Sequence, residues 1–246
     1  MFKLIKRVLT QNYYNKKAPK AFEHFYKYSS ESEAYLNFCT QVHQLDFPVQ
    51  NNLSQAQFQV LEEEISSSLP KNVLDLGCGT GDLFKHLSKK YKFKGLGLDF
   101  ALLKETSELK KANFETFSFE ENQFDLIYSI DSLYMMNNLR RTIKRTLKSL
   151  RSGGKFIIFY TATEEFALCP MAKPLRKLDL DYSLRDFTED DSKHWNNSDN
   201  VLNDMKKEFL NEGNVSIWKT KSQEAQKNKG LHASKSLFRY IITITK

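Results

Sequence analysis

The sequence predicts an α/β fold with a doubly wound, mostly parallel sheet, and three observations support that prediction. Short apolar segments alternate with amphipathic helical segments between residues 73 and 160. A glycine-rich turn joins the first of these apolar segments to the helix after it. The chain is 40% hydrophobic and 27% charged, which is typical of a soluble globular protein. Such alternation indicates parallel strands with helices packed on both faces of the sheet.

Each element follows from the spacing of apolar residues. One or two short amphipathic helices are expected within residues 1–30, a helical stripe over 31–47, and a helix over 54–70. The alternating core then predicts strands at 73–76, 93–98, 124–130 and 155–160, with helices at 82–90 and 139–150. The segment 161–187 is irregular, because Pro170 and Pro174 interrupt it.

The C-terminal part predicts one long polar helix and two final strands. The helix covers 189–211. The segments 215–220 and 237–245 are rich in β-branched and aromatic residues, which favour strands. The lysine-rich stretch 222–236 between them is expected to be a loop.

Length, cysteines and charge narrow the class of protein. The 246 residues suit one large domain, or one domain with an appendage. Three widely spaced cysteines and lysines that interrupt the first apolar residues predict a cytoplasmic protein without a secretory signal. The longest apolar runs are too short to span a membrane.

Residues 1–30 carry seven of the 37 basic residues and one acid, so the rest of the chain is nearly neutral in sum. That distribution makes a broad nucleic-acid-binding face less expected.

The turn after the first core strand predicts a nucleoside-binding site. Glycines at 77, 79 and 81 let the backbone turn sharply and let a ligand approach it closely. Asp99, 22 residues after Gly77, ends the next strand, where a carboxylate can accept hydrogen bonds from ribose hydroxyls. The spacing is not that of a dinucleotide fingerprint, because Asp82 stands at its third glycine and would repel phosphate. Asp75 and Asp82 instead favour a ligand with a cationic amino-acid end.

These residues resemble the class I S-adenosylmethionine-dependent methyltransferases. The similarity rests on the D-x-G-x-G-x-G motif at 75–81, Asp99, the block at 113–125 and the Gly-Gly-Lys-Phe turn at 153–156. It implies a Rossmann-like methyltransferase fold with a seven-stranded sheet whose last strand is antiparallel. It also implies an N-terminal helical arm or lid (1–50) and a cofactor-binding domain (51–246) with a substrate-side insertion around 161–213.

The resemblance implies roles for individual residues. Asp75 and the three glycines would hold the methionine and ribose parts of the cofactor, and Asp99 the ribose hydroxyls. Four residues would lie around the adenine or the methionyl group: Phe100, Asn113, Phe114 and Ser129. The 14 positions from Asp99 to Asn113 are too few for a full helix and strand, so one of these is expected to be truncated.

The acceptor side is less defined by the sequence. Asp131 could orient or deprotonate a methyl acceptor, or could cap a short helix. Tyr134 could wall the methyl site or pack in the core. The lid hypothesis assigns Tyr14, Tyr26 and Tyr28 to a cover over the cofactor, with ordinary helix packing as the alternative. The five histidines show no metal-ligand spacing, and no metal is expected.

Together these features predict methyl transfer from S-adenosylmethionine, with S-adenosylhomocysteine as product, to an N, O or C nucleophile of a small molecule. Alignment of the acceptor for in-line displacement would supply most of the catalysis. Two alternatives remain open. One is an RNA methyltransferase that uses the basic N-terminal residues, and the other is a cofactor-binding module without catalysis.

Overall fold

Within residues 17–246, the part of the chain that the computed structural model describes, seven strands form one sheet. They are β1 (Asn72–Leu76), β2 (Lys94–Asp99), β3 (Leu109–Lys111), β4 (Phe124–Ile130), β5 (Leu150–Ala162), β6 (Tyr182–Asp186) and β7 (Phe238–Thr245). Their order is β3-β2-β1-β4-β5-β7-β6, and β7 runs antiparallel to both of its neighbours. The predicted fold class, with its antiparallel last strand, is confirmed.

Helices cover both faces of this sheet. Successive residues of β5 point to opposite faces: Ile157 packs with α4 (Gln55–Ser68) and α5 (Asp82–Tyr91), and Ile158 with α6 (Leu139–Ser149) and α7 (Ala172–Lys177). Apolar residues on both sides explain why the central strands are continuous apolar runs rather than alternating ones.

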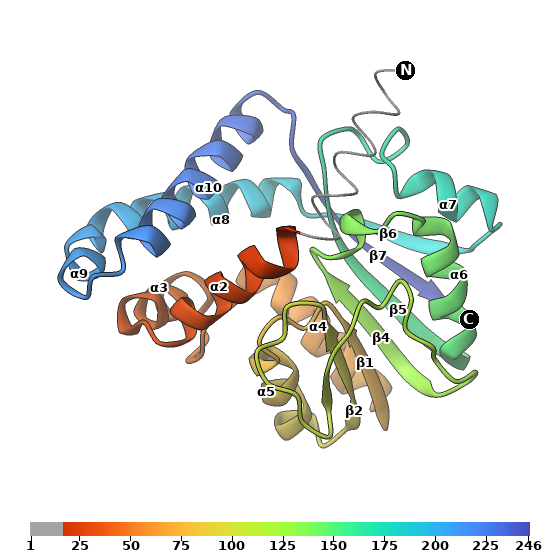
Figure 1. Ribbon diagram of the computed structural model, residues 1–246. Helices are drawn as coiled ribbons and strands as arrows, with labels where there is room; N and C mark the ends of the chain where they lie inside the picture. The colour runs from red at the N-terminus through yellow and green to blue at the C-terminus, as the bar shows by residue number, and fades with distance from the viewer. Residues whose placement is uncertain (1–16) are drawn as a thin grey trace.

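Five further helices, from the N-terminal and C-terminal parts of the described chain, pack together beside the sheet. These are α2 (Ala18–Ser30), α3 (Glu33–His43), α8 (Thr188–Asp204), α9 (Lys206–Asn211) and α10 (Val215–Ala233). Figure 1 shows them gathered on one side of the sheet. Tyr35, Phe38, Trp195 and Phe209 form their common apolar core. We call these five helices the helical cap.

The cap stands at the edge of the sheet where the parallel strands end. Ala162, the last residue of β5, pairs with Phe238, the first residue of β7. The helix α8 begins directly after β6, and α10 ends shortly before β7. Ligands of doubly wound sheets bind at this carboxyl edge, beside the strand where the order reverses. In this sheet that strand is β1, between β2 and β4.

Two of the sequence predictions for the C-terminal part are wrong. Residues 215–220 are not a strand and 222–236 are not a loop, because α10 spans Val215–Ala233. Ile217 and Ala225 are buried at helical spacing against the cap, and this packing outweighs the strand preference of the β-branched residues. The sixth strand, β6, lies instead in the segment predicted to be irregular, at an exposed edge where no apolar pattern marks it.

One other difference concerns helix length. The helix predicted over 189–211 divides at Met205 into α8 and α9.

The expected truncation between Asp99 and Asn113 is confirmed: the described chain passes from β2 to the three-residue β3 without a helix. Of the helices predicted within 1–30, α2 accounts for the described part. None of the helices in residues 17–246 is both long enough and apolar enough to cross a bilayer.

Candidate active site

The glycine turn leads from β1 into α5 and has a backbone that side chains disfavour. Gly77, Gly79 and Gly81 all have positive φ, of 91°, 60° and 84°. A Cβ on Gly77 would lie 1.9 Å from Oγ of Ser132, and one on Gly81 would lie 2.4 Å from Cδ1 of Leu109. Glycine is therefore required at these positions by the neighbouring chain as well as by the turn.

Asp99 closes the turn from the end of β2. Its Oδ2 accepts a hydrogen bond from the Gly79 amide at 3.0 Å, and its Oδ1 accepts one from the Ala101 amide at 2.7 Å. The carboxyl is only 3% exposed, and burial raises its pKa to about 6 although both amides favour the charged form. The structure thus brings the predicted ribose acid against the predicted glycine loop.

Tyr26 of α2 covers this carboxylate. Its hydroxyl donates to Oδ2 of Asp99 at 3.5 Å, and its side chain is buried. Burial, with the Asp99 charge beside it, raises the Tyr26 pKa well above its ordinary value. Tyr28 is 41% exposed and packs on His24 instead. Tyr14 lies outside the described residues. Of the two proposed lid tyrosines that lie within residues 17–246, Tyr26 contacts Asp99 and Tyr28 does not cover the turn.

Two predicted site residues lie beneath the turn rather than on its surface. The Asp75 carboxyl is 2% exposed beside Tyr128, and burial raises its pKa to about 8. At neutral pH it is mainly protonated. Ser129 is buried and donates its hydroxyl hydrogen to the Leu76 carbonyl at 2.9 Å, which ties β4 to β1.

A cleft of about 310 Å³ is lined in part by Phe100, the residue after Asp99. Its lining residues come from α2, the loops after β2 and β3, and the loop after β4: Pro19, Phe100, Asn113, Glu115, Thr116, Met135, Met136 and Asn137. Phe100 and Asn113, two of the residues predicted to lie around the cofactor, thus line one cleft. Phe114 does not line the cleft, because its ring is buried in the core under the sheet face that carries α6.

Asp131, the predicted catalytic acid, is paired with an arginine. Its carboxylate accepts bonds from both terminal nitrogens of Arg239 and, at 3.2 Å, from the Thr161 hydroxyl. Arg239 is fully buried, and its Nε donates to the Gln57 side chain at 2.8 Å. The alternative that the Asp131 side chain caps the N-terminus of a short helix is wrong. The short helix that follows it (Leu133–Met135) has no side-chain cap, and Asp131 bonds elsewhere.

Tyr134 stands at the surface near these groups. It is 46% exposed, so the alternative of core packing is wrong. Its hydroxyl is close enough to raise the pKa of both Tyr26 and Arg239.

Sequence reasoning missed Arg239, Gln57 and Thr161. One signal was present for the arginine, since Arg239 interrupts a strand that is otherwise β-branched and aromatic. A charged residue in such a strand is rarely buried without a partner. Nothing in the sequence connects it to Asp131, which is 108 residues away.

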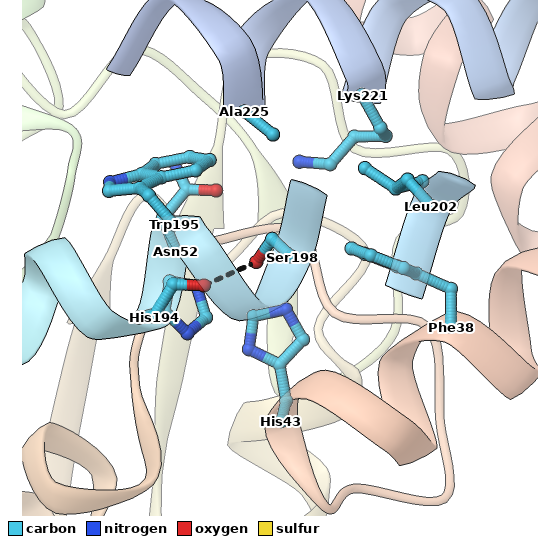
Figure 2. A pocket seen from close by; sticks show the side chains of 9 residues that line it. All are labelled: Phe38, His43, Asn52, His194, Trp195, Ser198, Leu202, Lys221 and Ala225. Carbon is cyan, nitrogen blue, oxygen red and sulfur yellow. Dashed lines mark hydrogen bonds between the residues drawn. The ribbon is translucent and has the colours of Figure 1, made fainter. Parts of the chain in front are cut away.

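A second polar cluster lies inside the helical cap and is packed shut. Figure 2 shows His43 and His194 facing each other near Lys221, and their ring centroids are 5.1 Å apart. The side chains leave no volume for a water-sized molecule. Burial lowers the His43 pKa to about 4 and also lowers that of His194, so both rings are neutral. His194 and Trp195 are both buried in the helical cap. No cluster of three metal-ligating side chains occurs among residues 17–246.

The comparison with known families identifies the class. A family model described as "Methyltransferase domain" matches residues 55–197, more than half of the chain. The chain therefore belongs to this methyltransferase-domain family, and the expected family is confirmed. The cofactor of that class is S-adenosylmethionine.

Individual relatives in sequence differ in named activity. The mitochondrial arginine-hydroxylase NDUFAF5 of Homo sapiens is 35% identical over 118 residues, which cover 41% of this chain and 34% of that protein. Phosphoethanolamine N-methyltransferase 1 of Triticum aestivum is 30% identical over 115 residues, or 39% and 23% of the two chains. Each match thus spans about a third or less of the relative.

Among solved structures, phosphoethanolamine N-methyltransferase 2 of Haemonchus contortus, with S-adenosylhomocysteine bound, has a TM-score of 0.72 at 13% identity. That alignment covers 92% of this chain and 60% of the other. It shows a shared fold.

Proposed function

We propose that this protein transfers the methyl group of S-adenosylmethionine to an N, O or C nucleophile of a small molecule. The observation that supports this most is the Asp99 carboxylate, which is held against the glycine turn, while the next residue, Phe100, lines a 310 Å³ cleft. When bound, the cofactor supplies a methyl group activated by its sulfonium charge. The residues of this chain bind it, exclude water and orient the acceptor.

The residues fit the cofactor on structural grounds. Asp99 would hold the ribose hydroxyls, because only two amides and a 3.5 Å tyrosine contact occupy its four acceptor positions. Phe100 and Asn113 would contact the adenine in the cleft. Gly77 and Gly79 would hold the methionine and ribose parts of the cofactor through the backbone of the turn. The Asp75 carboxyl would become charged when a cationic ammonium group binds nearby, since an opposite charge lowers a carboxyl pKa.

The acceptor side is proposed to consist of Asp131, Tyr134 and the cap. Arg239 pairs with the Asp131 carboxylate and fixes its orientation with two bonds. That pairing favours a role in orienting the acceptor over a role as proton-removing base. Tyr134 would form part of the wall of the methyl site. Residues 1–50 would act as a lid, because α2 already places Tyr26 on Asp99. The cap part of the 161–213 insertion would complete the acceptor pocket.

Two observations bear on substrate size and on compartment. Outside residues 1–30 the basic and acidic residues nearly balance, 30 against 29. This supports a small acceptor over RNA. A cytoplasmic location remains our proposal, which the three unpaired cysteines support.

The first test is calorimetric titration with S-adenosylmethionine and with S-adenosylhomocysteine. We expect micromolar binding by the wild type, weakened about tenfold to hundredfold in Asp99→Ala by the loss of charge-assisted hydrogen bonds. Asp179→Asn is the matched control, because this exposed aspartate has a positive φ that asparagine tolerates. If the folded wild type does not bind either ligand, the proposal is wrong.

Transfer is then measured with a radiolabelled methyl group, using pooled small amines, alcohols and carbon acids beside an RNA pool. Label in the small-molecule fraction supports the proposal. Label in the RNA favours the RNA alternative. Cofactor binding without transfer to any acceptor class favours a binding module.

A further inference from the structure

The helices α6 and α7 carry an unusual concentration of positive charge. They contain eight lysines and arginines and no acidic residue. Seven of these side chains are exposed: Arg140, Arg141, Lys144, Lys148, Lys173, Arg176 and Lys177. We call these seven residues the α6–α7 basic surface. The two helices contact each other on the same face of the sheet (Figure 1). The chain outside residues 1–30 is therefore nearly neutral in total charge, but this charge is distributed unevenly over its surface.

Little in the described chain neutralises this surface. Arg140, Arg141 and Lys144 form no ion pair with any described residue, while Lys148 pairs with the exposed Glu121 at 3.3 Å. The fifth basic residue of α6, Arg145, points inward and donates to the carbonyls of Glu115 and Phe117. Four acids flank α7 in the chain: Glu164, Glu165, Asp179 and Asp181. Folding alone does not account for the free cations, since the buried side of α6 supplies its packing.

The surface also begins at the candidate active site. Asn137 lines the 310 Å³ cleft, and Asn138 caps α6 by accepting a bond from the Arg141 amide at 3.1 Å. The first free cations of α6 therefore stand one helical turn or less from the cleft. A partner on this surface would lie at the cleft mouth.

We propose that the α6–α7 basic surface docks an acidic protein partner. Arg140, Lys144 and Lys148 recur every four residues, about 6 Å apart along the axis, so they can face a row of carboxylates on a partner helix. Three of the seven cations are arginines, which bind carboxylates with two parallel bonds.

Other polyanions suit the surface less well. Binding of single-stranded nucleic acid uses a charged groove with aromatic side chains, and neither α6 nor α7 contains an aromatic residue. Binding flat on a membrane needs an apolar helix face toward the lipid, but Ile143 and Leu175 of these helices are buried against the sheet.

The test compares three labelled probes at equal concentrations of negative charge, by fluorescence anisotropy or sedimentation. They are a helical peptide with glutamates at every fourth residue, a uridine oligonucleotide, and phosphatidylglycerol vesicles. A twin peptide with glutamine in place of glutamate is the uncharged control. We expect the glutamate peptide to bind most tightly, and to bind at least about tenfold more weakly at 200 mM than at 50 mM salt.

Two variants with the same charge change locate the binding. R140E/K144E reverses two exposed cations at i and i+4 on α6, and K85E/K89E reverses two with the same spacing on α5, on the other face of the sheet. We expect the first pair to weaken peptide binding about tenfold or more and the second less than twofold, with both variants folded by circular dichroism. Equal losses, tighter binding of the oligonucleotide or the vesicles, or no binding of the peptide would each overturn the proposal. Because binding is the readout, the result does not depend on methyl transfer.

Discussion

The two ends of the candidate site are built differently. At the cofactor end, Gly77, Gly79 and Asp99 come from one βαβ unit, and most of their contacts are with backbone amides. At the proposed acceptor end, the contacts are between side chains of two strands, the loop after β4 and a helix: Thr161, Arg239, Asp131 and Gln57. A site made of backbone near one turn leaves a motif in the sequence, whereas a site made of distant side chains does not.

The largest expected effect is at the acceptor end. Arg239→Ala leaves the Asp131 carboxylate, which is 10% exposed, without its charged partner. Breaking a buried pair on one side costs about 3–5 kcal/mol, so we expect a loss of that size in urea unfolding. Cofactor affinity should change little, since Arg239 makes no contact with the glycine turn.

The matched control is the double variant D131N/R239M, which removes both charges. It should be less destabilised than Arg239→Ala, because no charge stays buried alone. If Arg239→Ala abolishes cofactor binding while it remains folded, the two ends are not separate and the comparison fails.

The same division, between a site made of local backbone and a site made of distant side chains, explains which features the sequence predicted. The D-x-G-x-G-x-G motif located the turn, Asp99 and the fold class, because glycine conformations and a strand-end acid are local requirements. Asp131 was recognised, but its partner was not, since nothing local marks a pairing over 108 residues. The cap was misjudged for a related reason: α10 is helical through its contacts with α8 and α9, not through its own composition.

The second prediction concerns pH and the cofactor end. The Asp75 pKa is raised from 3.8 to about 8, so the folded chain holds this proton more tightly than the unfolded chain does. Its contribution to stability is fully present below about pH 4 and is lost as the pH rises toward 8. Between these limits the loss is at most about 1.4 kcal/mol per pH unit.

Asp75→Asn should remove this slope. His43 acts in the opposite direction, because its lowered pKa makes the folded protein bind its proton less tightly. The measurement is therefore the difference between the wild-type and variant unfolding free energies at pH 5, 6 and 7. A difference that does not change with pH would mean that Asp75 is charged in the folded protein.

A smaller effect is expected from Gly77→Ala. The new Cβ would meet Ser132 Oγ at 1.9 Å at a residue with φ of 91°, so the turn must shift. We expect a loss of about 2 kcal/mol in stability from strain, and weaker cofactor binding. Gly153→Ala is the control, because Gly153 also has a positive φ, of 75°, but open space around it. The difference between the two variants isolates the steric part. Equal losses would show that Ser132 moves aside without cost.

The smallest effect separates the lid from the scaffold. Tyr26→Phe removes one hydroxyl, whose bond to Asp99 is long at 3.5 Å, and keeps the ring that packs on Phe22. A single hydrogen bond contributes about 0.5–1.5 kcal/mol, and the loss here should be at the lower end. Without ligand, the Asp99 carboxyl loses a donor that favours its charged form, so its pKa should rise further.

If the tyrosine is a lid that ribose hydroxyls displace, the variant should bind S-adenosylmethionine as tightly as the wild type or slightly more tightly. If Tyr26 instead helps to hold the cofactor, affinity should fall along with stability. Calorimetry on Tyr26→Phe, with Tyr28→Phe as the exposed control, decides whether α2 is a cover or a part of the binding site.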